Sequence, residues 1–423
     1  MVALTVAPTA GLMAAQTAAS SPQTPALARL IGIDVEEFAR EYWGRQALLT
    51  PAGAATTGSG FADLLDADAV DELVSERGLR TPFLRVARDG STLADASFTA
   101  PGGVGASIGD QVSDDQLVRL FADGATMVLQ ALHRVWPPVL AFTQQLAADL
   151  GHPVQANAYV TPPQNQGFSN HYDVHDVFVL QVTGEKRWVI HAPVHASPLR
   201  HQPWTDRRRS VERRAAETPL IDTVLRPGDV LYLPRGFLHA ATALGGVSTH
   251  LTLGVHTWTR YGVAEQLIQH ALRTVAGDPE ARSSLPLGVD VADPTALVAE
   301  VELVREKLVD ALENTEIDAV AAAFAPLARA GQRAAPVGPL RQLRAADELT
   351  DDTPVTVRAH LAGTLHERPD GGLTISGRGG QTTVTAAERE AFLDWWKIGS
   401  GTAGELGIGL ARRLLLTGLA VAG

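Results

Sequence analysis

The sequence predicts a mixed α/β protein whose core is a β-barrel or sandwich with helices on either side. Two observations predict the core. Short apolar runs with strand character follow one another between residues 176 and 254, and Pro/Gly turn signals separate them. Apolar residues at helical spacing before and after this region predict the flanking helices. The length of 423 residues leaves room for two or three domains.

The N-terminal part is predicted to begin with a tail. Residues 1–26 are rich in Ala, Thr, Ser and Pro, and they contain no Lys or Arg, so a basic signal-peptide region is absent and disorder is expected. An amphipathic helix is expected over Asp34–Trp43. Further helices are expected over Gln116–Leu132 and Val139–Leu150, with Pro137 and Pro138 breaking the helical run between them.

The central part alternates predicted strands with predicted turns. The expected strands are Asp176–Val182, Arg187–Ile190, Val230–Leu233 and Ser248–Gly254. The expected turns are Thr183–Lys186, Leu225–Asp229 and Pro234–Phe237. The last of these turns follows a short apolar strand and leads to a single histidine, His239.

A metal-ligand pattern stands out in this region. His171, Tyr172 and Asp173 are consecutive, and on an extended chain His171 and Asp173 point to the same side while Tyr172 points away. Together with His239 they match the 2-His-1-carboxylate facial triad, which leaves open positions on Fe(II) for a co-substrate and O2. A lone His-x-Asp occurs often by chance. The turn-strand-turn frame before His239 makes the combination specific. Nearby histidines without this frame are expected at the surface or in support of the ligands: His175, His191, His195 and His201.

Three segments resemble the JmjC-type, cupin-like oxygenases, and within them the ribosomal oxygenase branch. These segments are Thr161–Asp173, Phe178–Trp188 and Pro227–His239. The resemblance is dense over about residues 150–256 and extends more weakly from about residue 28 to the C-terminus. It implies a double-stranded β-helix (cupin or jelly-roll) core. It also implies an Fe(II)- and 2-oxoglutarate-dependent protein hydroxylase that acts on ribosomal proteins.

The resemblance assigns roles to individual residues. His171, Asp173 and His239 become the iron ligands, and Lys186 pairs with the distal carboxylate of 2-oxoglutarate, assisted by Tyr159. A buried dicarboxylate does need a cationic partner. The alternatives are a solvated turn lysine for Lys186 and a half-buried strand aromatic for Tyr159. Related enzymes often have a serine where this chain has Gly254, and Thr252, on the same strand face, is the expected substitute.

Composition limits the remaining possibilities. Zero cysteines exclude disulfides and thiol catalysis, and no apolar stretch is long enough for a membrane span, so we expect a cytoplasmic protein. The net charge of −12 disfavours nonspecific nucleic-acid binding and suits a basic polypeptide substrate. The run Arg207–Arg209, with Arg213 and Arg214, is either a solvated loop or a contact at the substrate rim.

The C-terminal part is predicted to be helical first. A helix is expected over Ala264–Val275, and Asp293-Pro294 has the features of a helix start. The following apolar stripe fits either intrachain packing or a homodimer contact: Leu297, Val301, Val304, Leu308 and Leu312. A linker over Ala335–Leu340 precedes a region that resembles a degenerate winged helix. Its expected elements are the strands Val355–Val357 and Leu373–Ile375, a capping box at Thr385 and a final helix Gly409–Thr417.

We therefore expect a tail over residues 1–26, a catalytic domain over 27–260, a helical region over 261–345 and a winged-helix-like domain over 346–423. Three functions stay open. They are hydroxylation of a ribosomal-protein side chain such as Arg or His, the same chemistry on a ribosomally made peptide natural product, and a non-catalytic interaction module with a cupin fold. Hydroxylation of an N-methyl group, which leads to demethylation, is a further variant of this chemistry.

Overall fold

The computed structural model describes residues 25–54, 60–88, 90–163, 165, 169–331, 333–377 and 380–423. The predicted disordered tail lies outside the described residues up to position 24, and Ala26 is already buried in the core. Gln164 and residues 166–168, which belong to the segment Thr161–Asp173, also lie outside the described residues. The chain divides between Thr257 and Trp258 into two compact units. No helix in the described ranges has the length and apolar character needed to cross a bilayer.

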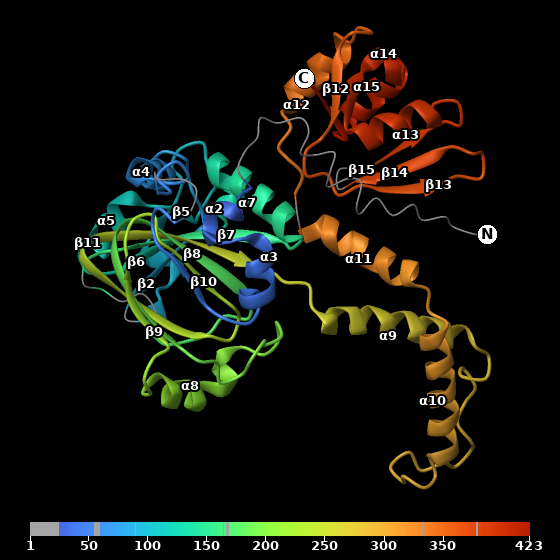
Figure 1. Cartoon of the computed structure of the whole chain (residues 1–423), viewed down its shortest axis with the longest axis horizontal. Helices are drawn as coiled ribbons and strands as arrows, with labels where there is room; N and C mark the ends of the chain where they lie inside the picture. Colours follow the sequence, from blue (N-terminus) through green and yellow to red (C-terminus); the bar gives the residue numbers. More distant parts are fainter. Residues whose placement is uncertain are drawn as a thin grey trace. The chain divides into compact units, whose positions relative to one another are not determined.

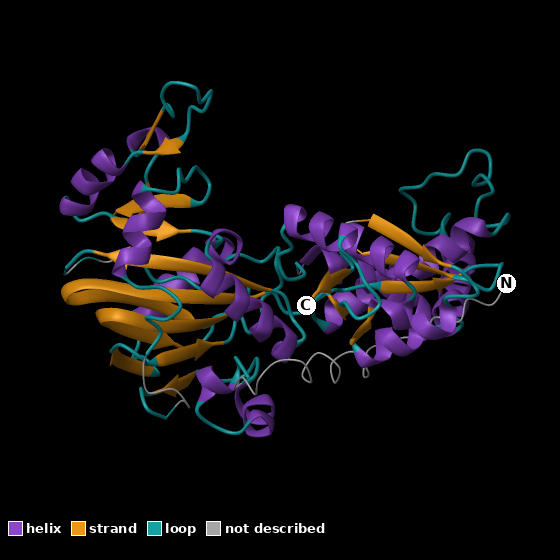
Figure 2. Cartoon of the chain, turned by 90° about the horizontal axis from the view of Figure 1, so that it is seen from above, coloured by secondary structure: helices purple, strands orange, loops and turns teal. Residues whose placement is uncertain are grey.

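The first unit is built on an antiparallel sheet with the strand order β1-β10-β8-β11-β7-β6-β2-β3, in which β9 pairs with β8. Figure 2 shows strands of this unit stacked in layers. The sheet confirms the predicted β-strand core, and all of its pairings are antiparallel. Its strands are β1 Leu48–Thr50, β2 Leu84–Arg88, β3 Ser91–Thr92, β6 Thr126–Leu129, β7 Val154–Thr161, β8 Asp176–His191, β9 Ile221–Leu225, β10 Val230–Leu233 and β11 Leu238–Val255. A separate pair is formed by β4 Thr99–Ala100 and β5 Gln111–Val112.

Strand β8 does not contain the predicted turn at Thr183–Lys186. It runs through this segment as one long strand beside β11, and the pairing register shifts where the turn was expected. Gly184 has φ +64°, so the glycine that signalled a turn instead forms an irregularity inside the strand. The predicted turn before β10 and the strand β10 itself are confirmed, and Gly228 has φ +95° in that turn.

The irregularity at Gly184 changes which face each residue of β8 occupies. Before it, Phe178 and Leu180 belong to the main hydrophobic core, while Val177 and Val179 face the other side. Beyond it, Trp188 joins the side of Val177 and Val179, although its number is even. A strand alternates faces with a period of two, so a shift of one residue exchanges the faces. The change turns the even-numbered residues that follow, including Lys186, toward the pocket described below.

The helices of the first unit pack around this sheet. They are α2 Ala28–Ile31, α3 Val35–Glu37, the π-helix η1 Phe38–Tyr42, α4 Ala67–Ser75, the 3-10 turn η2 Asp95–Ser97, α5 Asp114–Ala122, α6 Leu132–Val135, α7 Pro137–Leu150, the 3-10 turn η3 Trp204–Arg207 and α8 Arg208–Ala215 (Figure 1). The predicted helix over Asp34–Trp43 is confirmed as α3 and η1, with Asp34 as the N-cap. Helix α7 is confirmed with Pro137 at its first position.

The predicted helix over Gln116–Leu132 is wrong in its second half. Helix α5 ends at Ala122, and Gly124, with φ +90°, turns the chain. The apolar residues that follow form β6, which pairs with both β2 and β7. Two strand partners therefore override the helical periodicity of this short segment.

The second unit combines helices with two small sheets around its own core. Its helices are α9 Arg260–Gly277, α10 Val298–Glu313, α11 Ile317–Gly331, α12 Pro339–Asp347, α13 Arg389–Ile398, α14 Ala403–Leu406 and α15 Ile408–Leu416. One sheet contains β16 Ser400–Thr402, β12 Pro354–Val357 and β17 Ala420–Ala422. The other contains β13 Thr364–Glu367, β14 Leu373–Gly377 and β15 Gly380–Val384. Phe392, Trp395 and Trp396 of α13 are buried in a core to which α12 to α15 and the two sheets contribute.

Most predicted elements of this unit are confirmed, but several boundaries differ. Helix α9 begins at Arg260, before the predicted Ala264, and α12 begins at Pro339, inside the predicted linker Ala335–Leu340. Helix α10 begins at Val298, because the Asp293 carboxylate accepts hydrogen bonds from the Thr295 amide (2.9 Å) and hydroxyl and so caps a separate turn. At Thr385 the Glu388 carboxylate accepts from the Thr385 amide at 2.9 Å, but the helix starts only after this turn, at Arg389. In the predicted apolar stripe, Val301 and Val304 remain 46% and 40% exposed, whereas Leu297, Leu308 and Leu312 are half-buried, so intrachain packing covers the stripe only in part.

Candidate active site

The three predicted metal ligands come together at one end of a pocket in the first unit. His171 and Asp173 lie just before β8, and His239 is the second residue of β11. One ligand atom of each lies within 4.8 Å of the others. The sequence predicted that His171 lies on a strand, but in the structure it lies outside the named strands. Its backbone forms an isolated bridge with His239, with the His239 amide donating to the His171 carbonyl at 2.9 Å. This bridge holds the two histidines together.

Hydrogen bonds orient both imidazoles toward a common point. The Nδ1 atom of His171 lies 2.8 Å from the Ser169 carbonyl, and the Nδ1 atom of His239 lies 3.1 Å from the Phe237 carbonyl. Each carbonyl accepts the Nδ1 proton, which leaves Nε2 as a neutral ligand atom. The Nε2 atom of His239 lies 3.8 Å from Oδ2 of Asp173. Tyr172 points away as predicted, and its buried hydroxyl donates to the Gln202 carbonyl at 3.0 Å.

Electrostatics keep these groups in the protonation states that a divalent metal requires. Burial and the neighbouring His171 lower the pKa of His239 to about 4, so this imidazole is neutral near pH 7. Burial raises the pKa of Asp173, but electrostatic interactions with the neighbouring His175, His239, His171 and Arg85 side chains outweigh that effect, and the pKa of the carboxyl ends below its ordinary value. A neutral His239 imidazole and the Asp173 carboxylate therefore face the same small volume as the His171 ring.

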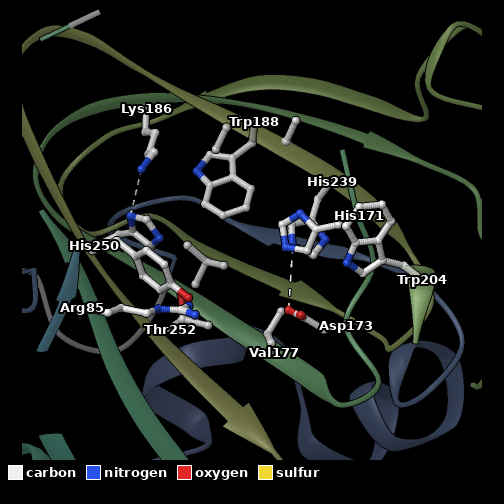
Figure 3. Close-up of a pocket in the computed structure, with 14 residues that line it drawn as sticks. Arg85, His171, Asp173, Val177, Lys186, Trp188, Trp204, His239, His250 and Thr252 are labelled. Carbon is white, nitrogen blue, oxygen red and sulfur yellow. Dashed lines mark hydrogen bonds and ion pairs between the residues drawn. The ribbon is translucent and has the colours of Figure 1, made fainter. Parts of the chain in front are cut away.

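Lys186 lies at the other end of the same cavity, which has a volume of about 260 Å³ (Figure 3). Its side chain is buried, with 3% of the residue exposed, which contradicts the alternative of a solvated turn lysine. Its Nζ atom donates to the Thr161 hydroxyl at 3.0 Å and lies 3.5 Å from Nδ1 of His250. Burial lowers the pKa of Lys186 to about 7. No carboxylate of the described residues forms an ion pair with it.

Tyr159 and Thr252 line this cavity, as the sequence predicted. The Tyr159 ring stacks on His250 with ring centroids 4.9 Å apart, and burial raises the pKa of its hydroxyl. The absence of a side chain at Gly254 is explained by a packing neighbour, and not only by Thr252 as a substitute for the missing serine. A Cβ atom at position 254 would lie 2.7 Å from the His175 ring, so this histidine fills the space that a side chain would need.

Several pocket residues were missed by sequence reasoning. His250 precedes Thr252 by two positions on β11, so strand alternation alone could have placed it in the pocket wall. Burial and the adjacent Lys186 hold its pKa well below the ordinary value. Arg85, on β2, also lines the cavity, and no local signal in the sequence marks it. Of the histidines expected at the surface or in support, His191 is buried, and His175 stacks on His256 at 5.3 Å.

This geometry agrees with a family match. Residues 138–263, which include all three candidate ligands, match the model of the JmjC domain. This chain contains a JmjC domain. The finding confirms the resemblance that the three sequence motifs had indicated.

The chain is similar to proteins named ribosomal oxygenase and histidyl-hydroxylase. Ribosomal oxygenase 1 of Gallus gallus is 31% identical over 291 residues, which is 65% of this chain and 46% of the relative. The bifunctional lysine-specific demethylase and histidyl-hydroxylase NO66 of Drosophila persimilis is 38% identical over 139 residues, which is 32% of this chain and 19% of the relative. The chain thus spans less than half the length of these curated relatives.

Solved structures show the same fold. The crystal structure of Escherichia coli ribosomal oxygenase YcfD aligns with a TM-score of 0.54 at 17% identity and covers 92% of this chain and 98% of that one. The structure of YcfD with cobalt and 2-oxoglutarate aligns with a TM-score of 0.53 at 16% identity, covering 93% and 99%. These alignments confirm the predicted JmjC cupin fold with its flanking helices and sheets.

The arginine run borders the pocket of the JmjC domain. Arg207 ends η3 and the other arginines lie on α8, so the run is helical rather than a loop. The Arg208 guanidinium lies 4.8 Å over the ring of Trp204, and Trp204 lines the cavity. A role at the substrate rim stays a prediction for this segment.

Proposed function

We propose that this chain is an Fe(II)- and 2-oxoglutarate-dependent oxygenase that hydroxylates a side chain of a ribosomal protein. One observation carries the proposal. A 2-His-1-carboxylate set and a buried lysine lie at opposite ends of one cavity (Figure 3). This combination suits a dicarboxylate that chelates a metal at one end and pairs with a cation at the other. The names of the relatives, ribosomal oxygenase and histidyl-hydroxylase, support the substrate class.

The residues present fit a divalent metal. Two imidazole nitrogens and one carboxylate oxygen occupy one face of the site, which is the donor set of non-haem Fe(II) oxygenases. The two backbone carbonyls that receive the Nδ1 protons fix the imidazoles before any metal binds. His171, Asp173 and His239 would hold Fe(II).

The residues also fit 2-oxoglutarate. Burying Lys186 without a carboxylate partner costs free energy, as its lowered pKa indicates, and an anionic ligand would recover part of that cost. Thr161 and His250 keep its ammonium group in place. Lys186 would receive the distal carboxylate of the co-substrate, with Tyr159 and Thr252 beside it in the cavity wall.

When bound, Fe(II) and 2-oxoglutarate together supply the O2-dependent oxidation of a C–H bond. The protein residues do the positioning. The triad would hold the metal, Lys186 would set the direction of the co-substrate, and the apolar residues Val177, Val179 and Trp188 would restrict water in the cavity.

We also propose a cytoplasmic homodimer with a basic polypeptide substrate. The net charge of −12 favours attraction of a basic chain. Partly exposed apolar residues on α9 and α10, such as Ile268 (50%) and Val304 (40%), offer a surface for a second copy. The division of the second unit into a helical region over 261–345 and a winged-helix-like domain over 346–423 remains part of this proposal.

The experiment that tests the function combines two readouts. The iron-loaded chain is incubated with 2-oxoglutarate, ascorbate and a ribosomal-protein fraction, and succinate is measured while the proteins are examined by mass spectrometry. Asp173→Ala is the matched control. The proposal expects succinate and a product heavier by one oxygen atom from the wild type, and neither from the variant.

The other outcomes separate the alternatives. Succinate without any product in the ribosomal fraction would contradict the ribosomal substrate and favour a peptide natural product. Neither succinate nor 2-oxoglutarate binding would contradict oxygenase chemistry and leave a non-catalytic interaction module. Release of formaldehyde would indicate demethylation in place of stable hydroxylation.

A further inference from the structure

Asp176 is a buried carboxylate that connects the two segments carrying the candidate metal ligands. It is the first residue of β8, just after the segment with Asp173, and 0% of it is exposed. The other segment is the turn Pro234–Phe237, which follows β10 and leads to His239. Removing a carboxylate from water is costly unless hydrogen bonds and a counter-charge compensate, so the partners of Asp176 indicate what it does.

The partners of this carboxylate lie on β10 and on the turn that follows it. The Tyr232 hydroxyl donates to Oδ2 of Asp176 at 2.7 Å, and the Arg235 backbone amide donates to Oδ1 at 3.1 Å. The Arg235 guanidinium forms an ion pair with Oδ1 at 3.3 Å, and it also donates to the Thr257 hydroxyl at 3.0 Å. One carboxylate therefore binds both the main chain and the side chain of the turn.

Tyr232, which donates one of these hydrogen bonds, is itself fixed in place. Its hydroxyl accepts from the Gly44 amide at 2.9 Å, and its ring packs against Phe38 and Trp43 with centroids 5.0 and 5.9 Å away. Burial and the Asp176 carboxylate hold the pKa of Tyr232 well above its ordinary value, so the hydroxyl keeps its proton and remains a donor.

The same turn makes two direct contacts with the candidate metal site. The Gly236 amide donates to the Asp173 carbonyl at 3.0 Å. The Phe237 carbonyl is the group that lies 3.1 Å from Nδ1 of His239 and orients its ring. A change in the path of this turn would therefore move His239 relative to Asp173.

We propose that Asp176 is a positioning residue for the candidate metal site, which holds the turn Pro234–Phe237 and thereby sets the affinity for a divalent metal. A buried ion pair contributes little stability in comparison with an apolar pair of the same shape, so stability alone does not explain this one. Outer hydrogen-bond partners that orient metal ligands typically change metal affinity by about 10- to 100-fold. The inference rests on the metal site of the proposed function, and not on its co-substrate or its protein substrate.

The test measures Mn(II) affinity in the wild type, Asp176→Asn and Tyr232→Phe. Each full-length protein is titrated with Mn(II) in the absence of 2-oxoglutarate, and free Mn(II) is measured by EPR. Asp176→Asn removes the ion pair and is expected to raise the Kd for Mn(II) by about 10- to 100-fold. Tyr232→Phe keeps the ring and removes one donor, so a smaller increase is expected. The visible spectrum of Co(II)-loaded Asp176→Asn should also differ from that of the wild type, because it reports the geometry of the ligands.

Asp149→Asn is the matched control. The Asp149 carboxylate also connects separate segments of the first unit, because it accepts from the Leu27 amide at 2.9 Å and from the Gln145 side-chain amide at 2.8 Å. Neither of these segments carries a candidate metal ligand. Asp149→Asn is therefore expected to lower the thermal stability and to leave the Kd for Mn(II) unchanged.

Three results would overturn the proposal. They are an unchanged Kd in both folded variants, an equal increase in Asp149→Asn, and a wild type that binds Mn(II) no more tightly than Asp173→Ala. If thermal unfolding shows that Asp176→Asn does not fold, Tyr232→Phe decides alone. Failure of the proposed function has a different signature. The iron-loaded wild type would then produce no succinate, while the weaker binding of Mn(II) by Asp176→Asn would persist.

Discussion

The buried position of Lys186 is costly for the folded protein. Its ammonium group is buried, its direct partners are a threonine hydroxyl and a histidine nitrogen, and burial lowers its pKa to about 7. A scaffold without a ligand has no physical need for this arrangement. This cost is explained if Lys186 serves to bind an anionic ligand. Replacing Lys186 should therefore increase the stability of the ligand-free protein and weaken ligand binding.

Lys186→Met should stabilise the ligand-free protein and abolish its stabilisation by 2-oxoglutarate. Methionine fills a similar volume without a charge, so we expect a gain of about 1–4 kcal/mol in the free energy of unfolding at pH 7. The wild-type lysine has a folded pKa of about 7 and an ordinary value of 10.5, so the unfolded chain binds more protons between these values. Wild-type stability therefore rises with pH across this window, and the difference between the proteins narrows. Denaturant unfolding at pH 7 and pH 9 measures both effects, and a variant less stable at pH 7 would contradict the account.

Binding of 2-oxoglutarate should weaken as the pH rises above 7. The distal carboxylate requires the protonated lysine, so above the free pKa of about 7 each binding event takes up a proton. We expect the Kd to increase by about tenfold per pH unit in this range and to be flat below it. Calorimetry with the metal-loaded protein in two buffers of different ionisation enthalpy counts the protons. The same slope in Lys186→Met would rule out this lysine as the titrating group.

Individual residues also show how much of the site the sequence could predict. His171, Asp173 and His239 stand in local motifs, so their types and spacing predicted one metal site, and the family resemblance added Lys186 to it. His250 followed from strand alternation but was overlooked. Arg85 could not be predicted, because its place in the pocket depends on β2 reaching β7 through β6, and nothing near position 85 records that pairing.

At the scale of the element, the irregularity in β8 connects the fold to the site. Sequence reasoning interpreted Gly184 as a turn because glycine with a positive φ is common in turns. A single strand does not reveal its partner, and it is β11 that keeps β8 extended through this point. The change of faces at Gly184 is what directs both Lys186 and Trp188 into the cavity.

Gly184→Ala should be much more destabilising than Gly245→Ala. Both glycines have a positive φ, +64° and +66°, so both substitutions carry a similar backbone cost of about 1 kcal/mol. A Cβ atom at position 184 would lie 2.2 Å from the Val247 carbonyl oxygen, whereas position 245 has nothing within 4 Å. We expect an additional loss of about 1–3 kcal/mol for Gly184→Ala.

Thermal and denaturant unfolding compare the two glycine variants directly. In Gly184→Ala the binding of 2-oxoglutarate should weaken as well, because the irregularity aims Lys186. Equal stability of the two variants would show that the close approach at Gly184 does not matter.

At the scale of the whole molecule, each unit has its own hydrophobic core, and all candidate ligands belong to the first. Helical periodicity predicted the helices of the second unit well, because its signals are local. The same periodicity did not decide whether the apolar stripe on α10 packs within the chain or against a second copy of it. The exposure of Val301 and Val304 favours the second copy.

Ile268→Glu combined with Val304→Glu should convert the proposed dimer to a monomer. Two charges placed in an apolar interface would each remain without a partner, which strongly disfavours association. Light scattering coupled to size exclusion measures the mass. Val118→Glu on α5, a residue 68% exposed in the first unit, is the matched control and should leave the mass unchanged. A monomeric wild type would contradict the proposal.

The central claim is that one cavity holds a metal at the His171–Asp173–His239 end and 2-oxoglutarate between that metal and Lys186. Anaerobic calorimetry of 2-oxoglutarate binding to the Mn(II)-loaded full chain tests it most directly. We expect one molecule bound per chain, binding that disappears when the metal is removed, and loss of binding in both Asp173→Ala and Lys186→Met. Undiminished binding in either variant, or no binding to the metal-loaded wild type, would contradict the account.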